Sequence, residues 1–513
     1  MRAAQWTAAL TGVAAGAVAL AVAGVCAAVL DGLSLVGGTA SPLLALGAAF
    51  IDATPAWLKD WAIATFGTRD KQVLVAGMIV VVTLLCAGLG LLGAPRAAGG
   101  SGRRRLALAI FAALGAGVVA IVLLRPGAAA LDLLPTALGV GSGIVVLGHR
   151  WRRADQQPDL DRRRVLRWAG LTTVLAAAVA LVGQVLSGRE QAESARADAE
   201  LPEVTDPVTV PPEAEVAVDG MTPYVTPNED FYRIDTAIVP PSLDPQQWRL
   251  RVHGMVRREV EIDYAELLEQ PMIESLTTLA CVSNTVGGNL VGNAVWTGWP
   301  IRELLARAEP LAEADMVLST SSDGFTASTP LEALTDERAS LLAIGMNGEP
   351  LPVEHGYPVR MVVPGLYGYV SATKWVVDLK VTTFDADVAY WTPRGWSARG
   401  PIKTSSRIDV PARSARVNAG RVVVAGVAWA QHRGIALVEI RVDSDGPWRP
   451  AELADEPTID SWRQWYWHWD APVGKHTLSV RATDSEGAVQ ISESGPPAPD
   501  GATGLHTIYV HVQ

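Results

Sequence analysis

The pattern of apolar and polar positions divides the chain near residue 190. Before that point the chain carries apolar runs of about 20 residues, the length that a helix needs to cross a bilayer. These runs occupy 6–30, 73–93, 106–124, 129–148 and 168–187. After that point apolar and polar residues alternate over short stretches separated by turn residues, a pattern typical of β-strands. The chain is therefore predicted to join an N-terminal α-helical transmembrane bundle to a strand-rich globular part.

A further apolar stretch, at 33–51, leaves the number of spans open. Pro42 breaks it and charged residues follow it, so we predict a segment at the membrane surface with Trp57 and Trp61 near the headgroups. The alternative is a sixth span, which would invert part of the topology. With five spans and a cytoplasmic start, twelve arginines fall on the cytoplasmic side and four Lys or Arg residues on the other. This bias favours five spans and places the chain after residue 190 outside the cytoplasm.

The segment before the last predicted span carries the sequence DRRRVLR at 161–167. It resembles a twin-arginine export signal, which directs the export of proteins that have already folded. The plain alternative is an ordinary cluster of positive charge on the cytoplasmic side of a membrane helix.

The globular part is predicted to contain two folding units after a linker. Residues 187–221 are rich in Glu, Ala and Pro, a composition typical of a solvated, extended linker. An α+β region follows, with strands Trp248–Val252, Met316–Thr320, Val359–Val363 and Trp375–Val381 and helices Asp263–Glu269 and Ile301–Ala308. From residue 409 the predicted elements are nearly all strands, including Arg421–Trp429, Ile435–Val442, His476–Thr483 and Thr507–Val512. About seven short strands in this region favour an immunoglobulin-like β-sandwich.

Charge, cysteine and histidine content exclude several classes of protein and of metal site. Residues 1–189 carry 17 Lys and Arg against 8 Asp and Glu, whereas residues 190–513 carry 25 against 45. Neither part has the basic face of a nucleic-acid-binding protein. Three cysteines are too few for a disulfide scaffold, a four-cysteine zinc site or a cysteine-held iron–sulfur cluster. A bis-histidine haem in the membrane part is also excluded, because that part holds one histidine, His149.

Cys281 is the one cysteine after residue 189. It lies in LACVSNTVGG at 279–288, where an apolar strand gives way to a polar loop that contains glycine. A lone cysteine is most often a small buried hydrophobic residue. Outside the cytoplasm, however, an unpaired thiol is a liability unless it is protected or used, and backbone N–H groups in such a loop suit a ligand-bound thiolate.

Several motifs occur together and in order around this cysteine. They are TPNEDFY at 226–232, TLACVSN at 278–284, MNGEPLPVEHGYPVRMVVPG at 346–365, KW at 374–375, WRQWYWHW at 462–469 and VRATDSEG at 480–487. Together they resemble the sulfite oxidase family of molybdenum enzymes, over about 223–513. The apolar runs and the linker composition predict a transmembrane anchor at 1–189 and an extracytoplasmic linker at 190–222. The resemblance implies a molybdopterin-binding catalytic domain at 223–385, a connecting segment at 386–408 and an immunoglobulin-like, dimerisation-type domain at 409–513.

The resemblance also implies roles for individual residues. Cys281 matches the family's molybdenum-binding cysteine, so it is the predicted metal ligand and a catalytic residue. The positions that match cofactor contacts are Asn228, Tyr232, Arg233, His355, Arg360, Ala372, Thr373 and Lys374. Arginine and lysine are the side chains expected to face the phosphate of the pterin. Taken singly, Arg360 and Lys374 also fit surface charges at strand ends, and the tryptophans at 462–469 fit a sandwich core.

The sequence departs from the family in its anion-binding pocket. Two family arginines fall on Ile234 and Val286, a histidine falls on Thr236, and a tyrosine falls on Trp396, which is the second catalytic candidate. Burying a sulfite dianion among apolar groups would be costly without compensation. We therefore expect oxygen-atom transfer on a sulfoxide-like or other weakly charged small substrate. Sulfite oxidation is the alternative, if positive charge is restored by Arg394, Arg399 and Lys403.

The predicted protein is thus a multi-pass membrane protein whose extracytoplasmic part is a molybdenum-cofactor oxidoreductase, with no haem, no iron–sulfur cluster and no nucleic-acid partner. The chain lacks a CxxCH motif, so electrons are expected to pass through a separate carrier, a cytochrome or a membrane quinone system. A homodimer is implied by analogy alone. Export of a domain loaded in the cytoplasm favours the twin-arginine interpretation. A non-catalytic, membrane-tethered immunoglobulin-like binding or scaffold protein is the alternative from another class.

Overall fold

The computed structural model describes residues 2–32, 41–55, 58, 65, 70–94, 100–125, 128–156, 192–204, 207–237 and 239–513. The chain forms two compact units. The first unit comprises Met1–Gln191 with Thr236–Pro241 and Ser322–Gly324, and the second comprises Ala192–Asp235, Ser242–Ser321 and Phe325–Gln513.

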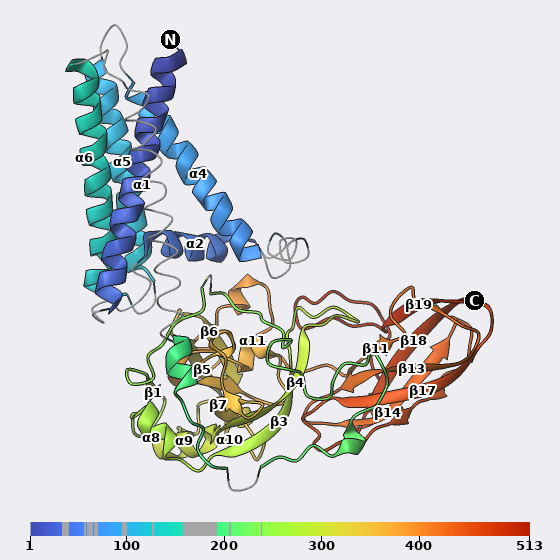
Figure 1. Cartoon of the computed structure of the whole chain (residues 1–513). Coiled ribbons are helices and arrows are strands. Elements are labelled where there is room, and N and C mark those ends of the chain that lie inside the picture. Colours follow the sequence, from blue (N-terminus) through green and yellow to red (C-terminus); the bar gives the residue numbers. More distant parts are fainter. Residues whose placement is uncertain are drawn as a thin grey trace. The chain divides into compact units, whose positions relative to one another are not determined.

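The first unit is helical (Figure 1). Its helices are α1 (Arg2–Gly32), α2 (Pro42–Ala53), α4 (Asp70–Leu92), α5 (Gly100–Leu123), the short 3₁₀ helix η2 (Ala130–Asp132) and α6 (Leu133–Gln156). Glycines let α1 and α4 approach closely, since a Cβ on Gly12 would lie 1.9 Å from the Cys86 carbonyl oxygen. Among the described residues, four stretches are long and apolar enough to cross a membrane: Gln5–Leu30, Val73–Leu92, Ser101–Leu123 and Ala130–Trp151. They coincide with the first four predicted runs and are compatible with a membrane anchor.

Two predictions for this unit concern shorter or later segments. The helix α2, with a proline in its first turn, has 12 residues and is too short to span a bilayer, which agrees with the predicted non-spanning segment. The fifth predicted run at 168–187, the twin-arginine-like stretch at 161–167 and the two tryptophans near residue 60 lie outside the described residues.

The α+β half of the second unit contains two sheets. In the first sheet the strand order is β2-β1-β10-β5-β6, with β1 parallel to β10 and the other pairs antiparallel. These strands are β1 (Arg249–Gly254), β2 (Val260–Asp263), β5 (Met316–Ser321), β6 (Thr326–Pro330) and β10 (Val376–Thr382). The second sheet is antiparallel, in the order β3-β4-β7-β8 with β9 also paired to β7. It contains β3 (Ile273–Ala280), β4 (Val291–Pro300), β7 (Leu341–Met346), β8 (Glu349–Pro350) and β9 (Arg360–Val362).

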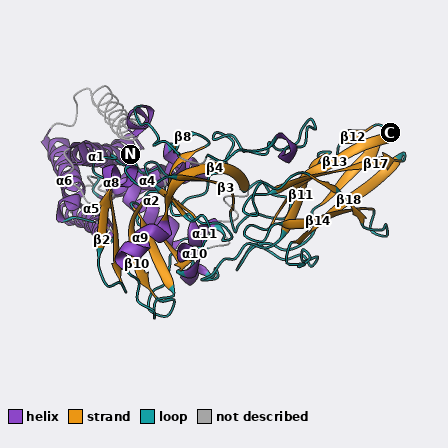
Figure 2. Cartoon of the chain, turned by 90° about the horizontal axis from the view of Figure 1, so that it is seen from below, coloured by secondary structure: helices purple, strands orange, loops and turns teal. Residues whose placement is uncertain are grey.

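Short helices cover these sheets and place the loops of the site (Figure 2). They are α8 (Tyr264–Leu268), α9 (Ile301–Ala308), α10 (Glu332–Thr335), η4 (Val353–His355) and α11 (Gly368–Ser371). The helix α9 has its predicted bounds, and its buried residues Ile301, Leu304, Leu305 and Ala308 recur at helical spacing. The carboxylate of Asp263 caps α8 by accepting a hydrogen bond from the Glu266 N–H at 2.9 Å.

The C-terminal half consists of two sheets that enclose one apolar core. Their strand orders are β11-β13-β17-β16 and β12-β19-β18-β14-β15. The strands are β11 (Ser405–Val410), β12 (Arg416–Val417), β13 (Gly420–Trp429), β14 (Ile435–Val442), β15 (Arg449–Pro450), β16 (Glu452–Leu453), β17 (Arg463–Ala471), β18 (Gly474–Asp484) and β19 (Thr507–Val512). Trp465 and Trp469 lie in this core and Trp462 packs with Tyr224 between the two halves, as expected for tryptophans of a sandwich core and its interface. The assignment to the immunoglobulin type stays a prediction.

The described part of 192–222 belongs to the second unit; most of its residues are exposed or half-buried and lie outside helices and strands, and a few contacts fix it. Residues 192–197 are helical, and Ala192 and Ala214 are buried. Arg196 donates from Nε to the Pro350 carbonyl at 3.0 Å and from Nη2 to Glu349 at 2.9 Å. Small apolar side chains and backbone hydrogen bonds hold this segment, so its low hydrophobicity gave no signal of packing.

Candidate functional site

Cys281 follows the last residue of β3 and begins the loop that returns to β4. Its N–H donates to the Leu290 carbonyl at 2.9 Å, and its own carbonyl accepts from the Asn284 N–H at 3.0 Å. The side chain is buried, with 8% of the residue exposed. Burial raises the pKa of the Cys281 thiol, and hydrogen bonds from Ser283 oppose that rise. A metal bound here would have to displace the thiol proton, because the thiolate is the ligand.

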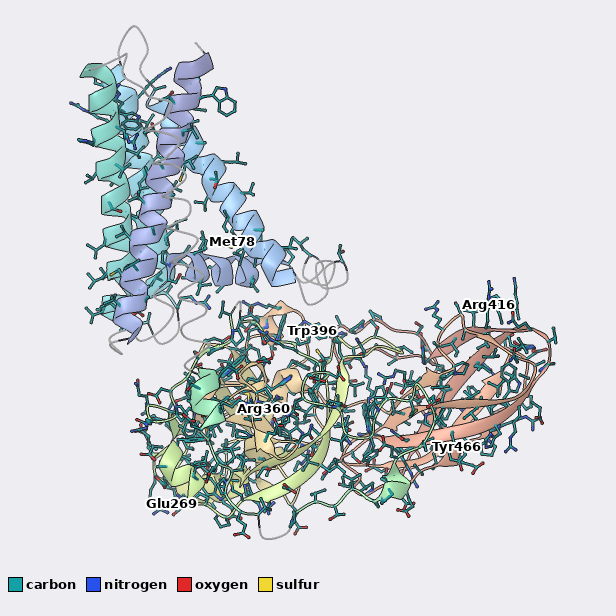
Figure 3. All side chains as sticks on the ribbon, viewed as in Figure 1. Met78, Glu269, Arg360, Trp396, Arg416 and Tyr466 are labelled. Carbon is teal, nitrogen blue, oxygen red and sulfur yellow. The ribbon has the colours of Figure 1, made fainter. Side chains whose placement is uncertain are left out.

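Arg360, at the start of β9, is a buried cation inside the α+β half (Figure 3). Its Nη1 donates to the His355 carbonyl at 3.0 Å, and its guanidinium carbon lies 4.9 Å from the centre of the Trp296 ring. Burial lowers the pKa of Arg360 to about 10, so the group is charged at neutral pH. Its hydrogen bonds within the described residues go to carbonyl oxygens and not to carboxylates. Such a group is ready to bind an anion.

Lys374 forms a buried ion pair beside this arginine. Its Nζ donates to Asp235 Oδ2 at 2.7 Å and to the Glu354 carbonyl at 2.9 Å. The same carboxylate oxygen accepts from Arg233 Nε at 3.0 Å. Burial lowers the pKa of Lys374 to about 8, an effect that Asp235 opposes.

His355, the last residue of η4, lies beside Arg360 and Lys374. Its Nε2 lies 3.2 Å from the Asn228 carbonyl oxygen, and its ring meets Phe231 edge-on at 5.6 Å. Burial, with Arg360 and Lys374 nearby, lowers the pKa of His355 to about 4. The imidazole is therefore neutral at physiological pH and donates one hydrogen bond.

Tyr232 and the segment after α11 link these cations to the cysteine. Burial raises the pKa of Tyr232, and Cys281 adds to this rise while Arg360 opposes it. A Cβ on Gly368 would lie 3.8 Å from both the Tyr232 hydroxyl and the Ala280 carbonyl. The Thr373 carbonyl accepts from the Met361 N–H at 2.9 Å, and the Ala372 carbonyl lies 3.5 Å from Arg360 Nη2.

The structure thus gathers the predicted residues Asn228, Tyr232, Arg233, His355, Arg360, Ala372, Thr373 and Lys374 around one region next to Cys281. Trp396 is buried in the same core cluster as Ala280 and Val282, the residues on either side of the cysteine. Its ring lies 6.0 Å from that of Tyr369 and 6.2 Å from that of Trp391.

Three cations of the connecting segment have partners of their own. Arg394 donates to the Tyr390 carbonyl and lies over the Tyr390 ring. Arg399 is exposed and lies 3.7 Å from Asp315, while Lys403 pairs with Asp500 at 2.8 Å. The suggestion that these residues restore positive charge beside the cysteine finds no support in their contacts.

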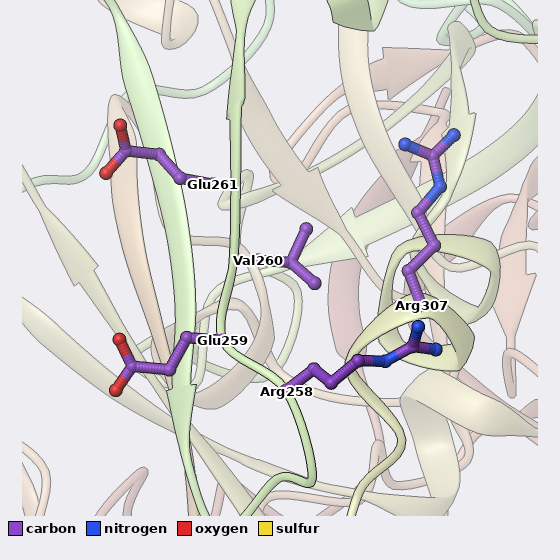
Figure 4. Close-up of a pocket in the computed structure, with 5 residues that line it drawn as sticks. All are labelled: Arg258, Glu259, Val260, Glu261 and Arg307. Atoms are coloured by element: carbon purple, nitrogen blue, oxygen red, sulfur yellow. The ribbon is translucent and has the colours of Figure 1, made fainter.

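A depression on the surface of the α+β half lies apart from these residues. It is lined by Arg258, Glu259, Val260, Glu261 and Arg307 (Figure 4). Its two arginines pair with Glu309 and Glu266. It contains none of the predicted site residues.

Two residues of the site escaped the sequence analysis. Asp235 bridges two cations, and Asn347 donates from Nδ2 to the Asn228 side chain at 2.8 Å while its Oδ1 accepts from the Val295 N–H. The signal for Asp235 was present, because Arg233 and Asp235 are two positions apart and point to the same side of an extended segment. Asn347 has a φ of 53°, a backbone conformation typical of a turn residue, and this local role concealed its side-chain contacts.

Comparisons with known proteins bear on this arrangement. Residues 236–391 match the family described as "oxidoreductase molybdopterin binding domain". Mitochondrial sulfite oxidase of Mus musculus is 28% identical over 338 residues, 56% of this chain and 61% of that protein. The sulfane dehydrogenase SoxCD of Paracoccus pantotrophus, a solved structure, has a TM-score of 0.49 and 23% identity over 60% of this chain and 87% of that chain. The uncharacterised oxidoreductase YuiH of Bacillus subtilis is 33% identical over 180 residues, 34% of this chain and 87% of that protein.

The chain belongs to the sulfite oxidase family. The resemblance carried by the ordered motifs is thereby confirmed, and residues 236–391 form a molybdopterin-binding domain of this family. The chain spans about three fifths of the length of the mitochondrial sulfite oxidases that it matches.

The donor set fits the family's molybdenum cofactor. A buried guanidinium without a carboxylate partner suits a phosphate, and a single buried thiol suits a soft metal ligand. The neutral His355 and the side-chain amide of Asn228 suit the polar edge of a pterin.

Proposed function

We propose that this protein is a membrane-anchored molybdenum-cofactor oxidoreductase that transfers an oxygen atom to or from a small, weakly charged substrate such as a sulfoxide. The observation that carries the proposal is the buried thiol of Cys281 beside the charged cluster of Arg360, Lys374 and Asp235. The protein supplies binding, orientation and electrostatics, and the bound cofactor supplies the two-electron oxygen-atom transfer.

Each proposed role follows from the environment of the residue. Cys281 would hold the metal once its thiol is deprotonated. Arg360 would face the phosphate of the pterin, because its charge is buried and its neighbours are carbonyls. Lys374 and Arg233 would add positive charge, which Asp235 balances in part. His355 would remain neutral and keep its Nε2–H on the Asn228 carbonyl, which leaves its Nδ1 as a hydrogen-bond acceptor.

The preference for a weakly charged substrate rests on apolar groups at three family positions. Ile234 and Val286 stand where arginines occur in the family, and Trp396 stands where a tyrosine occurs. The cations of the connecting segment are engaged elsewhere. An anionic substrate would therefore depend on the cluster that we assign to the cofactor phosphate. Sulfite is the second candidate, and the relatives that bear the name sulfite oxidase favour it.

The remaining proposals concern location, domains and partners. Four apolar helices support a multi-pass anchor, and the arginine distribution supports an extracytoplasmic position of the part after residue 190. We propose a catalytic domain at 223–385, a connecting segment at 386–408 and an immunoglobulin-like domain at 409–513. This last domain would also form the interface of a homodimer. Electrons would pass to a separate cytochrome or quinone-linked carrier.

A substrate panel tests the proposed activity. The purified full chain is assayed with sulfite and an artificial electron acceptor, and with methionine sulfoxide, dimethyl sulfoxide and trimethylamine N-oxide and a reduced viologen donor. The proposal expects kcat/KM for at least one neutral substrate to exceed that for sulfite. Turnover of sulfite alone would replace it with the second candidate. Loaded enzyme that turns over none of these compounds would contradict both.

A further inference from the structure

The loop that carries Cys281, residues 281–290, is held from two sides. On the side of the α+β half the loop closes on itself: the Cys281 N–H donates to the Leu290 carbonyl at 2.9 Å, and the Leu290 N–H donates to Asn284 Oδ1 at 3.0 Å. These bonds fix the two ends of the loop. They leave its middle, residues 285–288, to be held by other contacts.

Arg407 of β11, in the C-terminal half, holds the middle of this loop. Its Nη1 donates to the Gly288 carbonyl at 2.9 Å, and its Nη2 donates to Thr222 Oγ1 at 3.0 Å. Asp409 Oδ1 accepts from Arg407 Nε at 2.6 Å, and the two side chains are only 10% and 8% exposed. A buried, paired guanidinium has little rotamer freedom, so its hydrogen bond to Gly288 fixes the position of that carbonyl.

His506 packs against the preceding residue of the same loop. A Cβ on Gly287 would lie 2.3 Å from His506 Cδ2, and Gly287 has a φ of 75°, which favours glycine. The ring is itself fixed, since its Nδ1 accepts from the Ile408 N–H at 3.0 Å. A Cβ on Gly504 would lie 3.6 Å from Val286 Cγ2, so the C-terminal half also meets the loop at the position that departs from the family arginine.

We propose that Arg407 and His506 are positioning residues, which hold the 281–290 loop from the C-terminal half and thereby fix the direction of the Cys281 side chain. This inference rests on the proposed function, in which the Cys281 thiolate binds molybdenum. Groups that orient a metal ligand without touching the metal commonly change metal affinity about 10- to 100-fold when they are removed. The C-terminal half would thus help to position the metal ligand, in addition to its proposed role in forming a homodimer.

The first measurement uses the full chain produced without cofactor. Alkylation of Cys281 by N-ethylmaleimide is followed by mass spectrometry of the peptide that contains it, in wild type, Arg407→Ala, Arg407→Lys, His506→Ala and Arg416→Ala. Arg416 is an exposed arginine of β12 in the same half (Figure 3), so it is the matched control. Arg407→Ala and His506→Ala should raise the alkylation rate roughly tenfold, Arg407→Lys less, and Arg416→Ala not at all. Equal rates in wild type, Arg407→Ala and His506→Ala overturn the proposal.

The second measurement uses the loaded full chain and separates positioning from simple stability. The electron paramagnetic resonance spectrum of molybdenum(V) depends on the orientation of the thiolate, so it should shift in Arg407→Ala and His506→Ala and return toward wild type in Arg407→Lys. Molybdenum should dissociate roughly 10-fold faster from the two alanine variants. A loaded wild type whose spectrum is unchanged in both variants overturns the positioning role alone. A wild type without molybdenum overturns the proposed function and the positioning role with it.

Discussion

Lys374 Nζ lies 2.7 Å from Asp235 Oδ2, and the two side chains are only 10% and 5% exposed. The same carboxylate also accepts from Arg233. One buried acid therefore serves two cations, while Arg360 has no acid among its hydrogen-bond partners. Among these ion pairs and hydrogen bonds, three positive groups meet one carboxylate, an excess of positive charge that suits a bound phosphate.

Replacing Asp235 should therefore have opposite effects on the empty and the loaded chain. In cofactor-free protein, Asp235→Asn leaves Lys374 buried without its acid, and breaking a buried pair in this way costs roughly 3–5 kcal/mol. In loaded protein the phosphate would supply the missing negative charge, so the loss should be smaller. Melting temperatures of both forms measure the difference. The exposed acid Glu259, paired with Arg251, provides the control Glu259→Gln, which should leave the melting temperature nearly unchanged in both forms. An equal loss in both forms would count against a phosphate at this site.

Lys374 should make the free energy of unfolding depend on pH. The pKa of this lysine is about 8 in the folded chain and 10.5 ordinarily, so between these values the unfolded chain binds more protons. Because of Lys374, the free energy of unfolding therefore increases as the pH rises from 8 to 10.5. Below pH 8 both forms of the lysine are protonated, so Lys374 contributes no such increase. Lys374→Met should abolish it. Denaturation of cofactor-free wild type and Lys374→Met at pH 7.5 and pH 10 isolates the difference, and a difference that does not change with pH would show that the folded pKa is not lowered.

Arg360 should be required as an arginine and not merely as a positive charge. Arg360→Lys keeps the charge but loses the planar fork that donates to His355 and faces the Trp296 ring. We expect the molybdenum content of the purified chain to fall roughly tenfold or more, as for other groups that support a metal site. Metal analysis checks this, with Arg258→Lys in the surface depression as the control. Full metal content in Arg360→Lys would exclude a specific role for the guanidinium.

The segment 192–197 should resist proteolysis because Arg196 fastens it. Arg196→Ala removes the Nε–H hydrogen bond that the Pro350 and Leu351 carbonyls share and the bond from Nη2 to Glu349, which together contribute on the order of 1–2 kcal/mol. Limited proteolysis of the full chain should then cut within 192–204 several times faster than in wild type. Unchanged cleavage would mean that the segment is held by its alanines alone.

The sequence analysis succeeded where local patterns decide the structure. The helix α9 and the strands β14 and β19 have their predicted bounds, because amphipathic spacing and strand alternation are properties of consecutive residues. The family was identified and the candidate site residues were proposed from ordered motifs, since several motifs together specify a family where each alone does not.

The contacts that sequence could not supply join residues far apart in the chain. Arg407 and Gly288 are 119 positions apart, and Arg196 and Pro350 are 154 apart. No periodicity of the sequence connects such pairs. The hydrogen bonds that hold the cysteine loop and the segment 192–197 are therefore visible only in the folded chain. A composition rich in Glu, Ala and Pro indicated a solvated linker, but it could not indicate that Ala214 is fully buried.

The most direct test of the central claim is the molybdenum and pterin content of the purified full chain in wild type, Cys281→Ser and Cys26→Ser. Cys26 is a half-buried cysteine of α1, so it controls for the loss of a thiol elsewhere. We predict about one molybdenum per chain in wild type and Cys26→Ser and a loss of metal in Cys281→Ser. No molybdenum in wild type, or equal molybdenum in all three proteins, would contradict the assignment of Cys281 as the metal ligand.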